Sequence, residues 1–233
     1  MIMPLFKLFL IKIFNFIKKI IRFYLDKEAK IYFSKMGLLN QLQLSKENIS
    51  PGFSDLKFLY KLIIDKKVST ILEFGGGYST LAMVEALKFN SKYNINTKIY
   101  ILESEKKWIK ILKKKLIKYT NYKIIYSKCN MHLVGMTPCH VYRNLPNITP
   151  DLIYLDGPDP SSIKSKIFNL NYQKGNNPMS ADVLLYEYKL KIGAIIVVDG
   201  RQNNVIFLKN NLKRKYKYKY YRLHYRSTFT LLH

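Results

Sequence analysis

The sequence predicts an α/β fold in which a parallel sheet is covered by helices on both faces. Short apolar runs alternate with amphipathic helical segments from residue 68 to about residue 213, and this alternation is typical of a parallel sheet. A glycine-rich turn at residues 75–77 follows the first apolar run. Two strand-like runs without a helix between them, residues 216–225 and 227–232, follow the last helical segment. They indicate an antiparallel hairpin at one edge of the sheet.

Composition fits one domain with a short extension. The chain has 233 residues, of which 48% are hydrophobic, so it is long and apolar enough to build a core. Its two cysteines, Cys129 and Cys139, exclude a disulfide scaffold and favour a reducing, cytoplasmic compartment. Forty Lys and Arg against fifteen Asp and Glu give a net charge of +25. Two explanations stay open: a compositional bias toward lysine, or an anionic partner.

The first cluster of charge lies in residues 2–25, which we predict to form an amphipathic helix. On a helical wheel of about 100° per residue, the basic residues fall in one arc and Phe and Ile side chains fill the opposite side. The basic residues are Lys7, Lys12, Lys18, Lys19 and Arg22. They interrupt the apolar run too often for a membrane-spanning helix or a signal peptide. The pattern is typical of a helix lying in a membrane interface, and packing on protein is the alternative.

The remaining elements follow in order. Residues 1–50 are predicted to hold this helix and a helical connector, and residues 51–233 the second domain, with Pro51-Gly52 as the break. Helices are predicted over residues 54–65, 79–89, 104–119, 181–190 and 203–213. Strands are predicted over residues 68–74, 97–102, 122–127, 151–155 and 193–198. The patternless stretch 159–179 is interpreted as a lid over an acceptor.

The glycine-rich turn is the first candidate binding site. Glycines between a strand and a helix allow a ligand to approach the backbone and the free N–H groups of the helix. The dinucleotide pattern G-x-G-x-x-G would need a third glycine where Thr80 stands. The acid Glu73 suits a cationic ligand better than a pyrophosphate, and it could face the amino group of S-adenosylmethionine. The candidate cofactor-binding residues are Glu73, Phe74, Gly75, Gly76, Gly77, Ser79 and Thr80.

A second cofactor-binding position is predicted at the end of the next strand. Glu103 lies about one strand–helix unit after the glycines, where a carboxylate can accept hydrogen bonds from both ribose hydroxyls. Ser104 follows it. The alternative for Glu103 is an exposed acid that interacts with a helix dipole.

These motifs together resemble the class I S-adenosylmethionine-dependent methyltransferases over about residues 54–233. The resemblance rests on ILEFGGGYST, IYILES, DLIYLDGPDP and GAIIVVDG, and LDGPDP with VVDGRQNN is similar to one bacterial subgroup. It implies a Rossmann-like sheet of seven strands in the order 3-2-1-4-5-7-6, the last strand antiparallel. It also implies S-adenosylmethionine over Gly75–Gly77, with Glu103 on the ribose.

Candidate catalytic residues follow the fourth and fifth strands. Asp156 and Asp199 end these strands, at the edge of the sheet where ligands bind. They could share a divalent cation. Without a metal, Asp156 would orient the methionine end or the acceptor hydroxyl, and Asp199 would act as a base or an anchor.

Two further candidates accompany these aspartates. Arg201 is predicted to pair with Asp199 or Asp156, or to hold an anionic substrate group. His140 is interpreted as a general base or as a hydrogen-bonded structural histidine.

The predicted function is O-methylation of a small molecule or glycan by a cytoplasmic enzyme. Residues 2–25 would place it on the inner, anionic face of a membrane. An RNA or DNA methyltransferase is the alternative that the run KRKYKYKYYR motivates. A non-catalytic, membrane-associated S-adenosylmethionine-binding protein is the third.

Overall fold

A computed structural model describes residues 2–42, 52–93, 96–159, 162–163 and 178–233, with side chains from residue 12 onward. Its central sheet has seven strands in the order β3-β2-β1-β6-β8-β10-β9. The strands are β1 (Thr70–Phe74), β2 (Lys98–Glu103), β3 (Tyr122–Tyr126), β6 (Leu152–Leu155), β8 (Ile195–Asp199), β9 (Tyr216–Tyr221) and β10 (Arg226–Leu231). The pairings in this sheet are parallel except for the two that β10 makes with β8 and β9. The predicted order 3-2-1-4-5-7-6 and the predicted terminal hairpin are confirmed.

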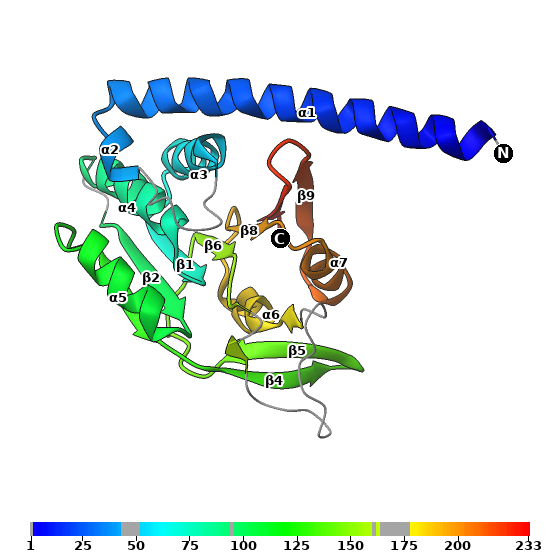
Figure 1. The fold of residues 1–233 in the computed structure, drawn as a ribbon. Helices are drawn as coiled ribbons and strands as arrows, with labels where there is room; N and C mark the ends of the chain where they lie inside the picture. Colours follow the sequence, from blue (N-terminus) through cyan, green and yellow to red (C-terminus); the bar gives the residue numbers. More distant parts are fainter. Residues whose placement is uncertain (1, 43–51, 94–95, 160–161, 164–177) are drawn as a thin grey trace.

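The sheet separates two apolar layers, because neighbouring residues of each buried strand point to opposite faces. In β1, for example, Ile71 joins one core cluster and Leu72 the other. The first cluster includes residues of α3 (Phe53–Asp65), α4 (Tyr78–Ser91) and α5 (Lys106–Lys115). The second includes residues of α6 (Asp182–Tyr186) and α7 (Gln202–Asn211). Figure 1 shows these helices on the two sides of the sheet.

A second, three-stranded sheet was not predicted. It consists of β4 (Cys129–Val134), β5 (Thr137–Tyr142) and the short β7 (Met179–Ser180). The β4–β5 hairpin packs its buried residues on the second core cluster. The 3-10 helix η2 (Glu187–Lys189) continues α6, so the predicted helix over 181–190 is divided into two short elements.

The N-terminal segment is a single helix, α1 (Ile2–Lys35), followed by the short α2 (Leu39–Leu42). The prediction ended this helix near residue 25, but residues 26–35 contain no glycine or proline, and Ala29 and Phe33 continue its buried stripe. Gly37, with φ of +69°, follows the end of the helix. Figure 1 shows α1 crossing above α3 and extending past the rest of the chain. Among the described residues, no helix combines the length and apolar content needed to cross a bilayer.

Contacts with α1 fix the position of α3. The Asp26 carboxylate accepts a hydrogen bond from the backbone N–H of Ser54 at 2.8 Å, so an acid of α1, not the Ser54 hydroxyl, satisfies the start of α3. Phe33 packs edge-on against Tyr60 with ring centroids 5.7 Å apart. The N-terminal helix therefore shares the core cluster of α3 and α4.

Candidate functional site

The glycine turn brings the ends of β1 and β6 into contact. Gly75 has φ of +87°, and a Cβ there would lie 2.3 Å from the Cα of Gly157. A side chain at Gly76 would meet Leu112 and Ile101 at 2.5 and 2.6 Å, whereas Gly77 faces open space. The first two glycines are therefore required by close approach of the chain, and the third leaves the start of α4 accessible to a ligand.

Glu73 lies beneath the turn, not on its ligand side. Its side chain is fully buried, and its carboxylate accepts hydrogen bonds from Ser79 Oγ at 3.2 Å and Thr80 Oγ1 at 2.7 Å. Burial raises the pKa of Glu73 well above its usual range. Phe74 is also fully buried and stacks on Tyr142 at 5.7 Å. The structure thus gives Glu73, Phe74 and Thr80 a supporting position under the turn.

Glu103 lies at the end of β2 and faces the turn. One carboxylate oxygen accepts the backbone N–H of Gly76 at 3.0 Å, and the other accepts that of Glu105 at 2.8 Å. Burial raises the pKa of Glu103 to about 7 despite these hydrogen bonds. Each carboxylate oxygen retains a further lone pair that can accept a ligand hydroxyl. Next to it, Ser104 Oγ lies 2.8 Å from Ser162 Oγ.

A cleft of about 480 Å³ opens over the turn and the strand ends, within the roughly 300–1,000 Å³ usual for ligand sites. Three groups of residues line it. The glycine turn and start of α4 contribute Gly75, Gly76, Gly77, Tyr78 and Ser79, and the end of β2 with the residues that follow it contributes Glu103, Glu105 and Trp108. The ends of β6 and β8 and one residue of α3 contribute Asp156, Gly157, Asp159, Asp199, Gly200, Arg201 and Asp55.

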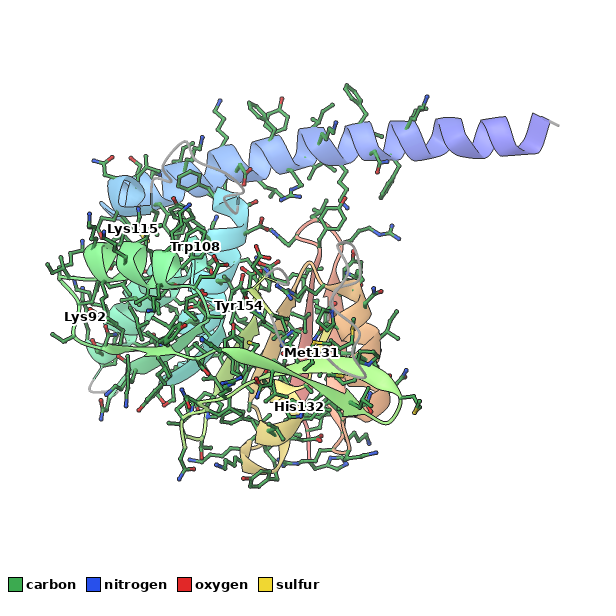
Figure 2. All side chains as sticks on the ribbon, turned by 60° about the horizontal axis from the view of Figure 1, so that its bottom comes forward. Lys92, Trp108, Lys115, Met131, His132 and Tyr154 are labelled. Carbon is green, nitrogen blue, oxygen red and sulfur yellow. The ribbon has the colours of Figure 1, made fainter. Side chains whose placement is uncertain are left out.

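The charge of this cleft is opposite to the charge of the chain. Six of the fifteen acidic residues line it, together with one arginine, although the whole chain carries +25. Of these six acids, Asp55 and Asp199 form ion pairs with described residues. Such a concentration of carboxylates in one concave site attracts a cationic ligand. Trp108 adds an aromatic wall on α5 and packs edge-on against Tyr78 at 6.1 Å (Figure 2).

Asp156 is the strand-end acid that the cleft exposes. Desolvation, and then the neighbouring Asp199 carboxylate, raise the pKa of Asp156 to about 6, while Arg201 and Arg226 oppose this rise. A carboxylate with a pKa near 6 is ionised at neutral pH and basic enough to accept a proton. Asp156 is therefore the candidate general base of the cleft.

Asp199 is held by buried partners. Its Oδ2 accepts the Tyr154 hydroxyl and, at 2.7 Å, Nη2 of Arg226. Arg226 has an exposed fraction of 1%, and its other terminal nitrogen donates to the backbone oxygen of Asp55 at 3.1 Å. Of the two roles predicted for Asp199, this geometry favours the anchor.

The same geometry does not fit a divalent cation between Asp156 and Asp199. The Arg226 guanidinium already supplies the positive charge beside the Asp199 carboxylate. In the part of the chain that the structure describes, no group of three metal-ligating side chains gathers. We therefore assign no metal-dependent step to this site.

Arg201 pairs with backbone, not with a carboxylate. Its guanidinium donates to the carbonyl oxygens of Asp156 and Pro158, the latter at 2.9 Å. It therefore fastens the turn after β6 to the start of α7. Within the described residues, no ion pair joins Arg201 to Asp156 or Asp199, because the guanidinium donates to the peptide carbonyls instead.

His140 does not line the cleft. Its ring has an exposed fraction of 1%, and within the described residues neither ring nitrogen has a hydrogen-bond partner. Nδ1 lies 3.8 Å from Oδ2 of Asp182. Burial, and then Arg201, lower the pKa of His140 to about 3, so the imidazole is neutral. An enclosed ring on β5 with a lowered pKa is a weak base and lies away from the cleft, so it is placed poorly for the predicted general base.

Asp55, Glu105 and Arg226 were not identified from the sequence as part of the site. Asp55 comes from α3 and Arg226 from β10, so their convergence with Asp199 depends on the folded topology. Glu105 follows Glu103 and could have been included with it. The predicted lid over residues 159–179 falls largely outside the described residues.

Comparisons with known proteins were made for sequence and for structure. No protein-family model and no curated protein matches the chain. A methyltransferase from Geobacter sulfurreducens has a similar structure, with a TM-score of 0.49 and 10% identity over 89% of this chain and 90% of that one. An S-adenosylhomocysteine-bound methyltransferase from Podospora anserina has a TM-score of 0.49 and 15% identity over 90% and 88%. An O-methyltransferase from Bacillus cereus, in complex with S-adenosylhomocysteine, has a TM-score of 0.47 and 13% identity over 89% and 90%.

The order of the strands defines the fold. A seven-stranded sheet with one antiparallel strand between β8 and β9 is the Rossmann-like arrangement that the sequence resemblance implied. Its carboxyl-terminal edge carries the glycine turn, Glu103 and Asp156.

Proposed function

We propose that this protein is an S-adenosylmethionine-dependent methyltransferase that O-methylates a small molecule or glycan. The observation that carries the proposal is the acidic cleft over the glycine turn of this fold. S-Adenosylmethionine carries a sulfonium and an ammonium group, and both are favoured by the excess of acidic over basic side chains in the cleft. A nicotinamide dinucleotide would instead bring its pyrophosphate against the same negative charge.

The residues of the cleft have separate tasks in this proposal. Gly75–Gly77 leave room for the cofactor backbone, and Glu103 accepts hydrogen bonds from its ribose hydroxyls. The bound cofactor supplies an electrophilic methyl group, which passes from sulfur to the acceptor oxygen and leaves S-adenosylhomocysteine. Asp156 takes the proton that the acceptor hydroxyl loses. Asp199 and Arg226 hold the neighbouring wall of the cleft.

The proposed acceptor is a small molecule or glycan because the cleft repels phosphates and two tyrosine rings of the basic strand β9 contact the neighbouring strand β10. Tyr216 and Tyr218 of β9 contact Phe229 of β10 at ring distances of 6.4 and 5.3 Å. The Lys209 ammonium lies 3.5 Å from the ring centre of Tyr218. These rings therefore support the sheet edge, which weakens the nucleic-acid alternative. The proposed location is the cytoplasmic face of a membrane.

Transfer of a labelled methyl group tests this proposal. We expect the full chain, incubated with methyl-labelled S-adenosylmethionine, to label a small-molecule and glycan fraction of cells. Glu103→Gln removes the charge that strengthens the ribose hydrogen bonds and should weaken S-adenosylhomocysteine binding roughly tenfold to a hundredfold. Glu28→Gln, the same change on the exposed surface of α1, is the control and should leave binding unchanged. Label found only in RNA, or equal binding by Glu103→Gln and the unchanged chain, contradicts the proposal.

A further inference from the structure

The helix α1 contacts the domain through the centre of its basic arc. Lys18 has an exposed fraction of 7%, and its ammonium lies 3.3 Å from the ring centre of Tyr225. One turn later, Arg22 donates to a carboxylate oxygen of Asp55 at 3.2 Å. Ala29 continues the same side and is fully buried. Two of the basic residues expected to face lipid headgroups, Lys18 and Arg22, thus face protein instead.

The opposite side of α1 is apolar and exposed. Its large side chains have exposed fractions between 39% and 66% and recur at helical spacing, about 180° from Lys18 and Arg22. They are Ile13, Phe16, Ile17, Ile20, Phe23 and Tyr24. Figure 2 shows side chains standing on the side of α1 away from the domain. A contiguous face of six large, exposed apolar side chains indicates a binding surface.

Charge decides between the possible occupants of this face. Lys12 and Lys19 are exposed and flank the apolar side chains along one border. A second copy would bring another net charge of +25 against the first and would face these lysines with its own. An anionic bilayer instead offers an apolar acyl-chain region in which the apolar side chains can be buried, and negatively charged headgroups that attract the lysines.

We infer that α1 binds the surface of an anionic membrane by inserting its outward face, while Lys18 and Arg22 on its inward edge contact the domain. The outward face is defined as Ile13, Phe16, Ile17, Ile20, Phe23 and Tyr24. This inference deepens the location proposed above. Because Arg22 bonds Asp55, and Asp55 lines the cleft, the cleft wall lies about one helix diameter, roughly 10 Å, from the lipid. An acceptor carried at the membrane surface would then lie within reach.

Liposome flotation of the full chain tests the assignment of the two faces. The vesicles are phosphatidylcholine alone, or phosphatidylcholine with about one third phosphatidylglycerol. We expect the unchanged chain to float with the anionic vesicles, and Phe16→Ser with Ile20→Ser to weaken this partitioning at least tenfold. Lys18→Gln with Arg22→Gln should float as the unchanged chain does. The matched control is Ile192→Ser with Ile206→Ser, which removes two exposed apolar side chains elsewhere and should change nothing.

Two results would overturn the inference. One is equal flotation of the outward-face variant and the unchanged chain. The other is a dimer in sedimentation velocity that the outward-face variant alone abolishes, because a second copy would then be the occupant. S-Adenosylhomocysteine binding is measured on every variant and should stay constant. Flotation that follows the expected pattern in a chain that binds no S-adenosylhomocysteine refutes the proposed function and leaves the membrane assignment standing.

Discussion

Asp156→Asn is expected to abolish most methyl transfer while leaving the protein folded and able to bind cofactor. The amide keeps the shape of the side chain but cannot accept the proton of the acceptor hydroxyl. Loss of a general base costs about a hundredfold to ten-thousandfold in rate. Since Asp156 is exposed to the cleft, the substitution buries no new polar group. The measurement is kcat with saturating S-adenosylmethionine, beside a calorimetric titration of S-adenosylhomocysteine.

The pH profile supplies an independent check of the same role. The pKa of Asp156 is raised to about 6, and only its ionised form accepts a proton. The value of kcat/KM for the acceptor should therefore fall as the pH drops below about 6 and should level off above it. Asp156→Asn should lose this dependence. A variant with kcat within threefold of the unchanged enzyme, and the same pH profile, would show that Asp156 is not the base.

Arg226→Met is expected to cause the largest loss of stability. The guanidinium is buried against the Asp199 carboxylate, and its removal leaves that charge beside the Tyr154 hydroxyl without a cation. Breaking a buried pair from one side costs about 3–5 kcal/mol in the free energy of unfolding. For a chain of this length that corresponds to a decrease in Tm of roughly 6–20 °C. Thermal unfolding followed by circular dichroism measures it.

A double variant separates the charge from the packing of Arg226. Asp199→Asn keeps a hydrogen-bond acceptor for Tyr154 and removes the unpaired charge, so adding it to Arg226→Met should recover more than half of the lost stability. Arg143→Met, at an exposed position directly after β5, is the control and should change the free energy of unfolding by less than about 0.5 kcal/mol. If the double variant is no more stable than Arg226→Met alone, the loss comes from packing and not from charge.

The sheet could be predicted because its strands carry their own signal. β1, β6 and β8 are mostly apolar on both faces and are bounded by turn residues. This pattern is typical of fully buried parallel strands. The β4–β5 hairpin carries no such signal, since Pro138 and His132 interrupt its apolar pattern. It is held by packing on the second core cluster, which only the folded chain provides.

The candidate site was predictable where function depends on local sequence. The glycine turn, Glu103 and Asp156 stand at strand ends that the pattern locates, and all of them line the cleft. The predicted cofactor-binding residues that do not line it are Glu73, Phe74, Thr80 and Ser104. The partners of Asp199 were not predictable, because Arg226 lies on β10 and is brought to it by pairing with β8. The same holds for α1: its wheel separates a basic from an apolar side, but only contacts with Asp55 and Tyr225 show which side faces the domain.

The central claim is that the acidic cleft binds S-adenosylmethionine, and a calorimetric titration of the full chain with S-adenosylhomocysteine and with NAD tests it most directly. We predict one S-adenosylhomocysteine site per chain with a Kd on the order of micromolar, and no heat from NAD, whose pyrophosphate meets six carboxylates. Binding of NAD, or the absence of S-adenosylhomocysteine binding, would contradict the account.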